Sequence, residues 1–188
     1  MKRYEYIPKK DTKRLTKIVI ALAVGGTVLF LLPIGLNIPF EWLSQMLGVS
    51  LITGMIFIIS RCIAKTFIYA IVENDENKLD LTVTETDSRG KKHTTVCRVA
   101  LSGITEAYLL CPERPEEKEK IKELTKKAKD EQRKIFSYNH DINPTPICLL
   151  FLEECGEPLF IKLSPDQELF GYFERACANR SEEQEEQE

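Results

Sequence analysis

Residues 18–60 contain a single ionisable side chain, Glu41, in a chain of 188 residues. The segment divides into two uncharged runs, 18–40 and 42–60, of 23 and 19 residues. A helix rises about 1.5 Å per residue, so each run is long enough to cross the roughly 30 Å hydrocarbon core of a bilayer. Helices also pair all their backbone polar groups internally, as lipid requires. The sequence therefore predicts a transmembrane helical hairpin over 18–60.

Two alternatives for this segment are a buried hairpin in a soluble core and a cleaved signal peptide. The rest of the chain could hardly surround two uncharged helices and also build its own core. The first apolar run is longer than a typical signal h-region, and no Ala-x-Ala cleavage site follows it. We therefore expect two membrane spans, with Phe40 and Trp42 in the interfacial region at the hairpin tip.

Small residues recur at helical spacing in both runs, as Ala21-x-x-x-Gly25 and Ser50-x-x-x-Gly54. Such spacings allow close helix approach, so we expect the two helices to pack on each other. Association through 18–60 into a small oligomeric accessory, pore or transport subunit is an alternative function. Its polar lining would be thin, because few polar side chains, all uncharged, lie in the spans.

Basic residues flank the hairpin on both sides. Residues 1–17 hold seven basic and two acidic side chains, and Arg61 and Lys65 follow the second run. The positive-inside rule then predicts a two-span protein of the cell membrane with both termini in the cytoplasm. The basic arm 1–17 is also a candidate for contact with anionic headgroups, at about 1 kcal/mol per basic residue. Simple orientation signalling is the alternative role of this arm.

After residue 65 the apolar pattern changes from helical to alternating, which predicts a mainly-β domain over 61–178. The sixth expected strand, ICLLFL over 147–152, is almost wholly apolar and should be central. The seven expected strands are 66–72, 79–85, 93–99, 104–111, 136–138, 147–152 and 159–163.

A C-terminal helix is expected after the last strand. Ser164 is the candidate N-cap, Pro165 the first helical residue, and Gln167 the partner in a capping box. The apolar face of this helix, which includes Leu169 and Phe173, should cover one end of the β core. The residues 179–188 that follow are rich in Glu and predict a disordered, solvated tail.

A charged helix is expected between strands four and five. Residues 113–134 hold nine basic and seven acidic side chains around a thin apolar stripe of Ile121, Leu124 and Ala128. Pairs such as Glu123 and Lys127 have the i,i+4 spacing that supports a helix. We interpret it as a solvated helix inserted in a loop; a partner-binding or membrane-skimming helix is the alternative.

Seven strands and one closing helix resemble the pleckstrin-homology (PH) superfold. The resemblance covers about 61–178 and rests on element order and on three stretches. With two membrane helices in front, the chain looks like the bacterial membrane-anchored PH-like proteins. Their pattern implies a basic or apolar turn before the next strand and a closing helix that plugs the barrel. The three stretches are the Leu79–Glu85 and His93–Ala100 hairpin, the phrase from Arg98 to Ile104, and LFIKLSPDQELFGYFERA over 159–176.

The resemblance suggests a test for lipid-phosphate binding. Phosphoinositide-binding members of the superfold use a basic loop between their first two strands. Here that loop is residues 73–77, with three carboxylates and Lys78 as the nearest basic residue. The carboxylates would repel a phosphate headgroup at the usual pocket, so we infer neither a bound headgroup nor a small-molecule substrate there.

The chain offers little for catalysis or cofactor binding. His93 begins a strand after two lysines, and His140-Asp141 lies in an expected turn. No zinc spacing, nucleophile elbow or phosphate-binding loop is present, so we expect no metal and no cofactor. The six cysteines lack CxxC spacing and fit reduced thiols in the cytoplasm. An enzyme dependent on Cys97 or Cys148 is a third hypothesis.

The function that the sequence favours is that of a non-catalytic membrane protein. A cytoplasmic PH-like domain would bind or scaffold a protein partner, or the chain would self-associate. Nucleic acid is not an expected partner, because the domain is net acidic and carries no recurring basic-aromatic strip.

Overall fold

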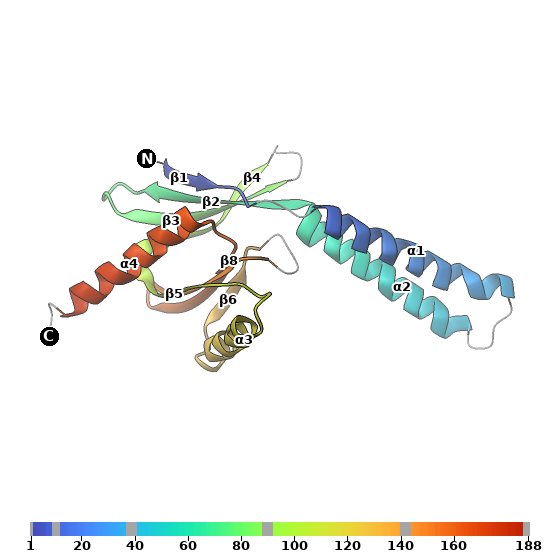
Figure 1. Ribbon diagram of the computed structural model, residues 1–188. Coiled ribbons are helices and arrows are strands. Elements are labelled where there is room, and N and C mark those ends of the chain that lie inside the picture. Colours follow the sequence, from blue (N-terminus) through green and yellow to red (C-terminus); the bar gives the residue numbers. More distant parts are fainter. Residues whose placement is uncertain (1, 9–11, 37–40, 88–91, 140–143, 186–188) are drawn as a thin grey trace. The chain divides into compact units, whose positions relative to one another are not determined.

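The computed structural model describes residues 2–8, 12–36, 41–87, 92–139 and 144–185 (Figure 1). The chain forms two compact units. The hairpin unit consists of residues 9–66, and the β unit of residues 1–8 together with 67–188. The sequence predicted a separate basic arm over 1–17 and a domain over 61–178. In the structure, the first eight residues of that arm belong to the β unit.

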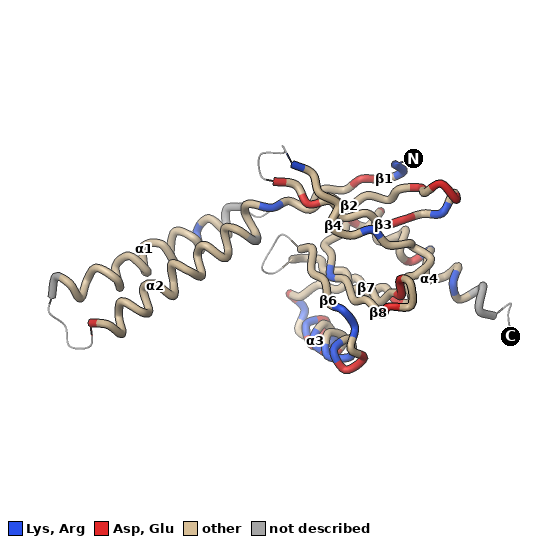
Figure 2. Tube along the Cα trace, turned by 180° about the vertical axis from the view of Figure 1, so that it is seen from behind, with Lys and Arg blue, Asp and Glu red and all other residues tan. Residues whose placement is uncertain are grey.

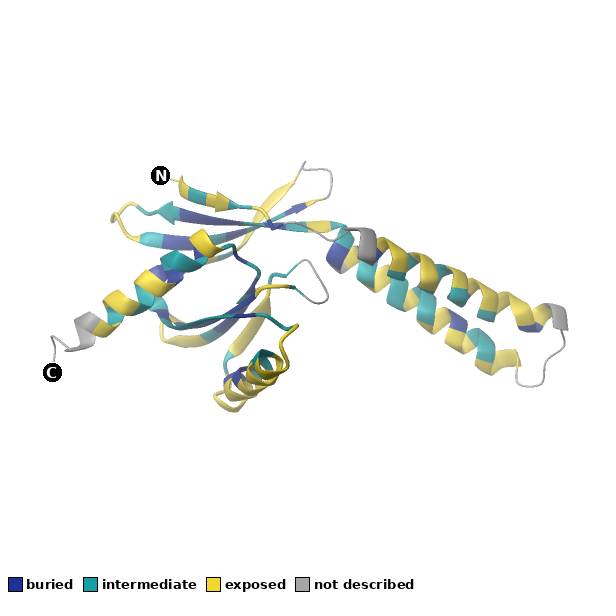
Figure 3. Cartoon of the chain, in the orientation of Figure 1, coloured by how far each residue is buried: buried dark blue, intermediate teal, exposed yellow. Residues whose placement is uncertain are grey.

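The hairpin unit contains α1 (Thr12–Leu36), α2 (Glu41–Ile58) and a π-helical turn, η1 (Ile59–Ile63). Both long helices are long and apolar enough to cross a membrane, and Figure 2 shows how few charges they carry. Only 11% and 6% of their apolar windows are buried, and Figure 3 shows most of both helices coloured as exposed or intermediate. A hairpin buried in a soluble core would show the opposite pattern.

The two helices pack on each other through Gly26 and Gly48. A Cβ atom at Gly48 would lie 2.8 Å from the carbonyl oxygen of Gly26 and 2.9 Å from the amide nitrogen of Phe30. The expected close packing is therefore present, but the closest approach lies at Gly26 and Gly48 and not at the two predicted pairs. A Cβ atom at Gly25 would lie 3.9 Å from the Leu51 side chain of α2, and one at Gly54 would have no neighbour within 4 Å. Small-residue spacing alone does not specify which face of a helix turns toward its partner.

Pro33 interrupts the hydrogen-bond ladder of α1. Proline has no amide hydrogen, so the carbonyl four residues earlier, that of Leu29, loses its helical partner. The Ser44 hydroxyl on α2 donates to this carbonyl at 2.7 Å. A backbone acceptor in an apolar helix is thus satisfied by the other helix of the hairpin.

The first sheet of the β unit has the strand order β1-β2-β3-β4. Its strands are β1 (Lys2–Tyr6), β2 (Lys65–Glu73), β3 (Leu79–Asp87) and β4 (His93–Ala100). β1 was not predicted, because its five residues lie within the basic arm. It pairs antiparallel with β2, and the apolar sides of Tyr4 and Tyr6 pack on the core.

The second sheet has the order β5-β7-β8-β6, in which β6 runs parallel to β8. The short turn η2 (Leu101–Gly103) leads into it from β4. All seven strands expected after residue 65 are present, and β7 is central as predicted. The strands are β5 (Ile104–Leu110), β6 (Lys134–Ser137), β7 (Ile147–Glu154) and β8 (Glu157–Leu163).

The main core lies between the two sheets and is covered at one end by α4 (Gln167–Glu185), as Figure 1 shows. Leu169 and Phe173 of this helix are fully buried, as predicted. The predicted cap at Ser164 was wrong. The carboxylate of Asp166 accepts the amide of Leu169 at 2.9 Å, so the helix is capped two residues later. The helix continues to Glu185, through part of the tail that was expected to be disordered.

A second core lies on the outer face of the second sheet, where α3 (Pro115–Asp130) covers it. Leu124 and Ala128 are 8% and 0% exposed, and they pack with Phe151 and Phe160. The expected inserted helix is therefore present between β5 and β6, but its apolar stripe packs on the sheet and is not solvated. β7 is buried on both faces, which explains why its sequence is apolar at successive positions instead of alternating.

One lysine of α3 also contacts the sheet. Lys127 was expected to pair with Glu123, but its ammonium lies 2.9 Å from the Glu106 carboxylate on β5. The same ammonium lies 5.0 Å from the centre of the Phe151 ring. A contact with β5 thus replaces the expected pairing of Lys127 with Glu123.

Candidate functional site

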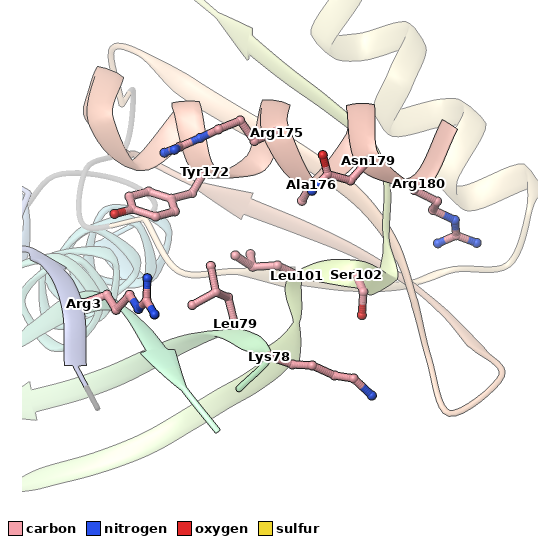
Figure 4. A pocket seen from close by; sticks show the side chains of 10 residues that line it. All are labelled: Arg3, Lys78, Leu79, Leu101, Ser102, Tyr172, Arg175, Ala176, Asn179 and Arg180. Carbon is pink, nitrogen blue, oxygen red and sulfur yellow. The ribbon is translucent and has the colours of Figure 1, made fainter. Parts of the chain in front are cut away.

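A pocket of about 440 Å³ lies in the β unit between β1, the β2–β3 turn, η2 and α4 (Figure 4). Four basic side chains line it, and no lining residue is acidic. We term it the basic pocket. Its basic residues are Arg3, Lys78, Arg175 and Arg180.

Two of the cations come from the strand end of the pocket. Arg3 on β1 makes a two-point contact with Glu73, at 2.9 and 3.1 Å. Lys78 follows the β2–β3 turn and lies 2.8 Å from the Glu76 carboxylate. The Asn74 side chain fixes this turn, because its oxygen accepts the amides of Glu76 and Lys78 at 2.9 and 3.0 Å.

The other two cations come from α4. The Arg175 guanidinium lies 4.5 Å from the centre of the Tyr172 ring and donates to the Gly171 carbonyl at 3.0 Å. Arg180 donates to the Gly103 carbonyl at 3.0 Å and approaches the Glu153 carboxylate at 3.4 Å. Arg180 therefore helps to hold η2 in place.

Gly103 makes this arrangement possible. A Cβ atom there would lie 2.5 Å from the carbonyl oxygen of Glu153. Only glycine allows η2 to approach the end of β7 so closely. The approach places Leu101 and Ser102 in the wall of the pocket.

The β1 strand is tied to α4 beside the pocket. The Tyr4 hydroxyl donates to the Asp166 carboxylate, and the Tyr4 and Tyr172 rings lie 5.9 Å apart. Burial and the hydrogen bond to Asp166 raise the pKa of the Tyr4 hydroxyl, so it remains a donor at neutral pH. These contacts fix the strand that carries Arg3.

The strand-end ion pairs are exposed and exchangeable. The hydrogen bond that Arg3 donates lowers the pKa of Glu73, and the hydrogen bond that Lys78 donates to Glu76 raises the pKa of Lys78. Water screens such surface pairs strongly, so a more highly charged anion can replace the carboxylates. Among the described residues, Arg175 has no carboxylate within ion-pair distance. The pocket can therefore hold an anion.

A second surface feature is the free edge formed by β4 and β6, each of which pairs on one side only in the described strands. Val96 on β4 and Phe136 on β6 are 37% and 39% exposed. The Tyr138 ring, just after β6, stacks on Phe136 with centres 6.2 Å apart, and its hydroxyl donates to the Val96 carbonyl at 3.4 Å. We term this surface the β4–β6 edge.

The histidines that were considered for catalysis do not form a site in the described residues. The His93 ring nitrogen Nδ1 lies 3.0 Å from the Thr86 hydroxyl at an exposed strand start. His140 and Asp141 lie outside the described residues. No cluster of three or more His, Cys, Asp or Glu that could hold a metal ion occurs in the described chain.

The cysteines are free thiols in the structure. Burial raises the pKa of the Cys97 and Cys148 thiols, which keeps both protonated at neutral pH. A nucleophilic cysteine requires the opposite shift, which nearby positive charge produces. The surroundings of these thiols therefore suit core residues.

Sequence reasoning did not find the basic pocket. Its cations are separated by up to 177 positions along the chain, and only Arg175 and Arg180 share an element. The three carboxylates of loop 73–77 argued against an anion site in the sequence. In the structure, two of them form ion pairs with Arg3 and Lys78 and are not part of the pocket lining.

Comparison with family models, with curated proteins and with solved structures finds no match to this chain. The function is therefore inferred from the geometry of the chain alone.

Proposed function

We propose that this chain is a non-catalytic binding module of the cell membrane. The hairpin unit anchors it by crossing the bilayer twice, and the β unit is a PH-like domain that binds a protein partner in the cytoplasm. The observation that carries the proposal is the pairing of β1 with β2, because these strands stand directly before and after the apolar hairpin.

The strand pairing constrains the topology of the anchor. Tyr4 pairs with Ile71, and Tyr6 with Tyr69, across the whole length of the hairpin in sequence. Two strands of one sheet must lie on the same side of a membrane. The chain therefore has to cross an even number of times between them, which two spans satisfy. The basic residues that flank the hairpin favour the cytoplasm as that side.

The architecture of the β unit supports a PH-like assignment. Two sheets enclose one core, and a C-terminal helix covers one end of it. Two features depart from the resemblance: β1 is added from the sequence before the hairpin, and β6 joins the second sheet in parallel. A fold of this class serves many functions, so the binding role rests on the surfaces.

The β4–β6 edge is the surface best suited to a protein partner. Among the described residues outside the hairpin, three of the four large exposed apolar residues, Val96, Ile135 and Phe136, lie on β4 or β6. An open strand edge offers unpaired backbone groups, and apolar side chains beside it add specificity. The helix α3 was the candidate partner-binding segment in the sequence. Its apolar stripe, which includes Leu124, packs on the outer face of the second sheet instead.

Photo-crosslinking in native membranes tests this proposal. A photoreactive amino acid is placed at Val96 or Phe136, and at Glu119 on the exposed side of α3 as the matched control. We expect one discrete adduct from both edge positions and none from the control. Identical adducts from all three positions, or no adduct from the edge, would refute partner binding there.

The alternative of a pore subunit is less well supported by the hairpin. Gln45 and Thr53, which could line a pore, donate to Glu41 and to the Val49 carbonyl within the same helix. Their polar groups are therefore already engaged. Ion flux through liposomes that contain the purified chain would favour the pore over the anchor.

A further inference from the structure

We propose that the basic pocket binds a phosphate monoester, an anion with a doubly charged phosphate attached to a small organic body. This ligand site goes beyond the partner-binding role proposed above and does not depend on it. The ligand chemistry is shared by a soluble phosphate ester and by a membrane lipid with a phosphomonoester headgroup.

The first argument is the charge of the lining. Three segments far apart in sequence contribute Arg3, Lys78, Arg175 and Arg180 to the lining of one pocket, no residue of which is acidic. Figure 4 shows the four charged ends spread around this pocket. Clustering of four like charges is unfavourable unless an anion offsets it. The neighbouring carboxylates Glu73, Glu76 and Glu153 offset part of this charge from outside the lining.

The second argument is that the Arg175 guanidinium is held in one position by contacts that do not involve a carboxylate. The Tyr172 ring supports one face of its guanidinium at 4.5 Å. One nitrogen, Nε, donates to the Gly171 carbonyl, which leaves the terminal nitrogens for a ligand. Such a planar fork matches two phosphate oxygens.

The third argument is the mixed lining of the pocket. Ser102, Asn179 and Tyr172 can donate hydrogen bonds, whereas Leu79, Leu101 and Ala176 form an apolar wall. A cavity of about 440 Å³ holds a small organic molecule as well as its phosphate. Inorganic phosphate alone would leave the apolar wall uncovered.

The existing ion pairs favour a dianion over a carboxylate. A monoanion would gain little over the contact that Glu73 already gives Arg3. A phosphate dianion can engage several cations at once and so displace the exposed partners of Arg3 and Lys78. Since the second ionisation of a phosphate monoester lies near pH 6, binding should strengthen as the pH rises through about 6.

The test uses the full chain in phosphatidylcholine nanodiscs. Glycerol 3-phosphate is titrated calorimetrically as the soluble probe, with acetate as the monoanion control. In a second arm, phosphatidic acid is added to the nanodiscs as the lipid probe. A liposome-retention assay would not report binding, because the chain is itself embedded in the membrane. Thermal stabilisation of the β unit, followed by tyrosine circular dichroism, is the readout there.

Arg175→Gln is the diagnostic variant, and Lys118→Gln on α3 removes the same charge outside the pocket. We expect Arg175→Gln to weaken binding at least about tenfold, because one charge-assisted contact is lost. Lys118→Gln should change the affinity less than about twofold, since it removes a charge outside the pocket whose effect on the ligand is screened by salt. Asn179→Asp, which places a carboxylate in the lining, should also weaken binding at least about tenfold.

Each outcome is informative. Binding of glycerol 3-phosphate with this variant pattern assigns the site to a soluble phosphate ester, and a response to phosphatidic acid alone assigns it to a lipid headgroup. Equal binding of acetate, equal effects of Arg175→Gln and Lys118→Gln, or no response to either phosphate probe would overturn the proposal. Binding of an acidic peptide without binding of either phosphate probe would also overturn it.

Discussion

Replacement of Leu124 by alanine tests whether α3 is part of the core. The Leu124 side chain is 8% exposed and packs against the outer face of the second sheet with Phe151 and Phe160. If the helix were a solvated insertion, the substitution would change the free energy of unfolding by no more than about 0.5 kcal/mol.

The packing predicts a larger effect. Truncation of a buried leucine to alanine costs about 2–5 kcal/mol, and the lower part of this range applies where the site can partly close. Leu124 contacts the sheet from a single surface helix that can settle inward, so we expect a loss of about 2–3 kcal/mol. For a unit of this size, that corresponds to a fall in melting temperature of roughly 6–15 °C.

The assay follows the two units separately in the detergent-solubilised full chain. All six tyrosines lie in the β unit, and the only tryptophan, Trp42, lies in the hairpin unit. Near-ultraviolet circular dichroism of tyrosine therefore reports unfolding of the β unit. Lys126→Ala, at an exposed position of the same helix, is the matched control. Equal melting temperatures for Leu124→Ala and Lys126→Ala would refute the core role of α3.

Three further predictions concern the hairpin, a turn and a carboxylate. Gly48→Ala should lower the melting temperature reported by Trp42 fluorescence, because the new methyl group meets the α1 backbone, whereas Gly54→Ala meets no atom within 4 Å and should not. Cys155→Asn should stabilise the β unit by about 0.5–1 kcal/mol in chemical denaturation, because Cys155 has φ 51° before Gly156 in the β7–β8 turn. The hydrogen bond from the Cys111 amide, followed by that from Arg114, lowers the pKa of Glu117. The stability that this carboxylate contributes is present above its ordinary value of 4.5 and is lost as the pH falls through the lowered pKa. A Glu117→Gln variant whose melting temperature keeps the same acid dependence would contradict this assignment.

The membrane hairpin and the strands could be predicted because each depends on local pattern. The apolar run 147–152 even indicated its central place, since a strand buried on both faces has no polar side. The role of α3 could not be predicted, because its apolar stripe is narrow and most of the apolar surface it covers is formed by β7 and β8, which follow the helix in sequence. The sequence pattern of Ile121, Leu124 and Ala128 is the same whether this side of the helix packs on a sheet or faces solvent.

The position of β1 and the basic pocket depend on contacts of long sequence separation. Arg3 and Glu73 meet because β1 pairs with β2 across the entire hairpin. The sequence of the five residues of β1 does not indicate which strand it pairs with. The cap of α4 was misplaced for a local reason: both Ser164 and Asp166 are good capping residues, and only the backbone decides between them.

The anchor topology is the central claim, and two cysteine positions test it most directly. Cys155 is exposed in the β7–β8 turn, and Glu41 lies at the start of α2 beside the hairpin connector. One chain keeps Cys155 as its only cysteine, and a second carries Glu41→Cys as its only cysteine. A membrane-impermeant maleimide added to intact cells should label position 41 at once and Cys155 only after permeabilisation. Labelling of Cys155 from outside, or labelling of both positions only after permeabilisation, would contradict the two-span anchor with a cytoplasmic β unit.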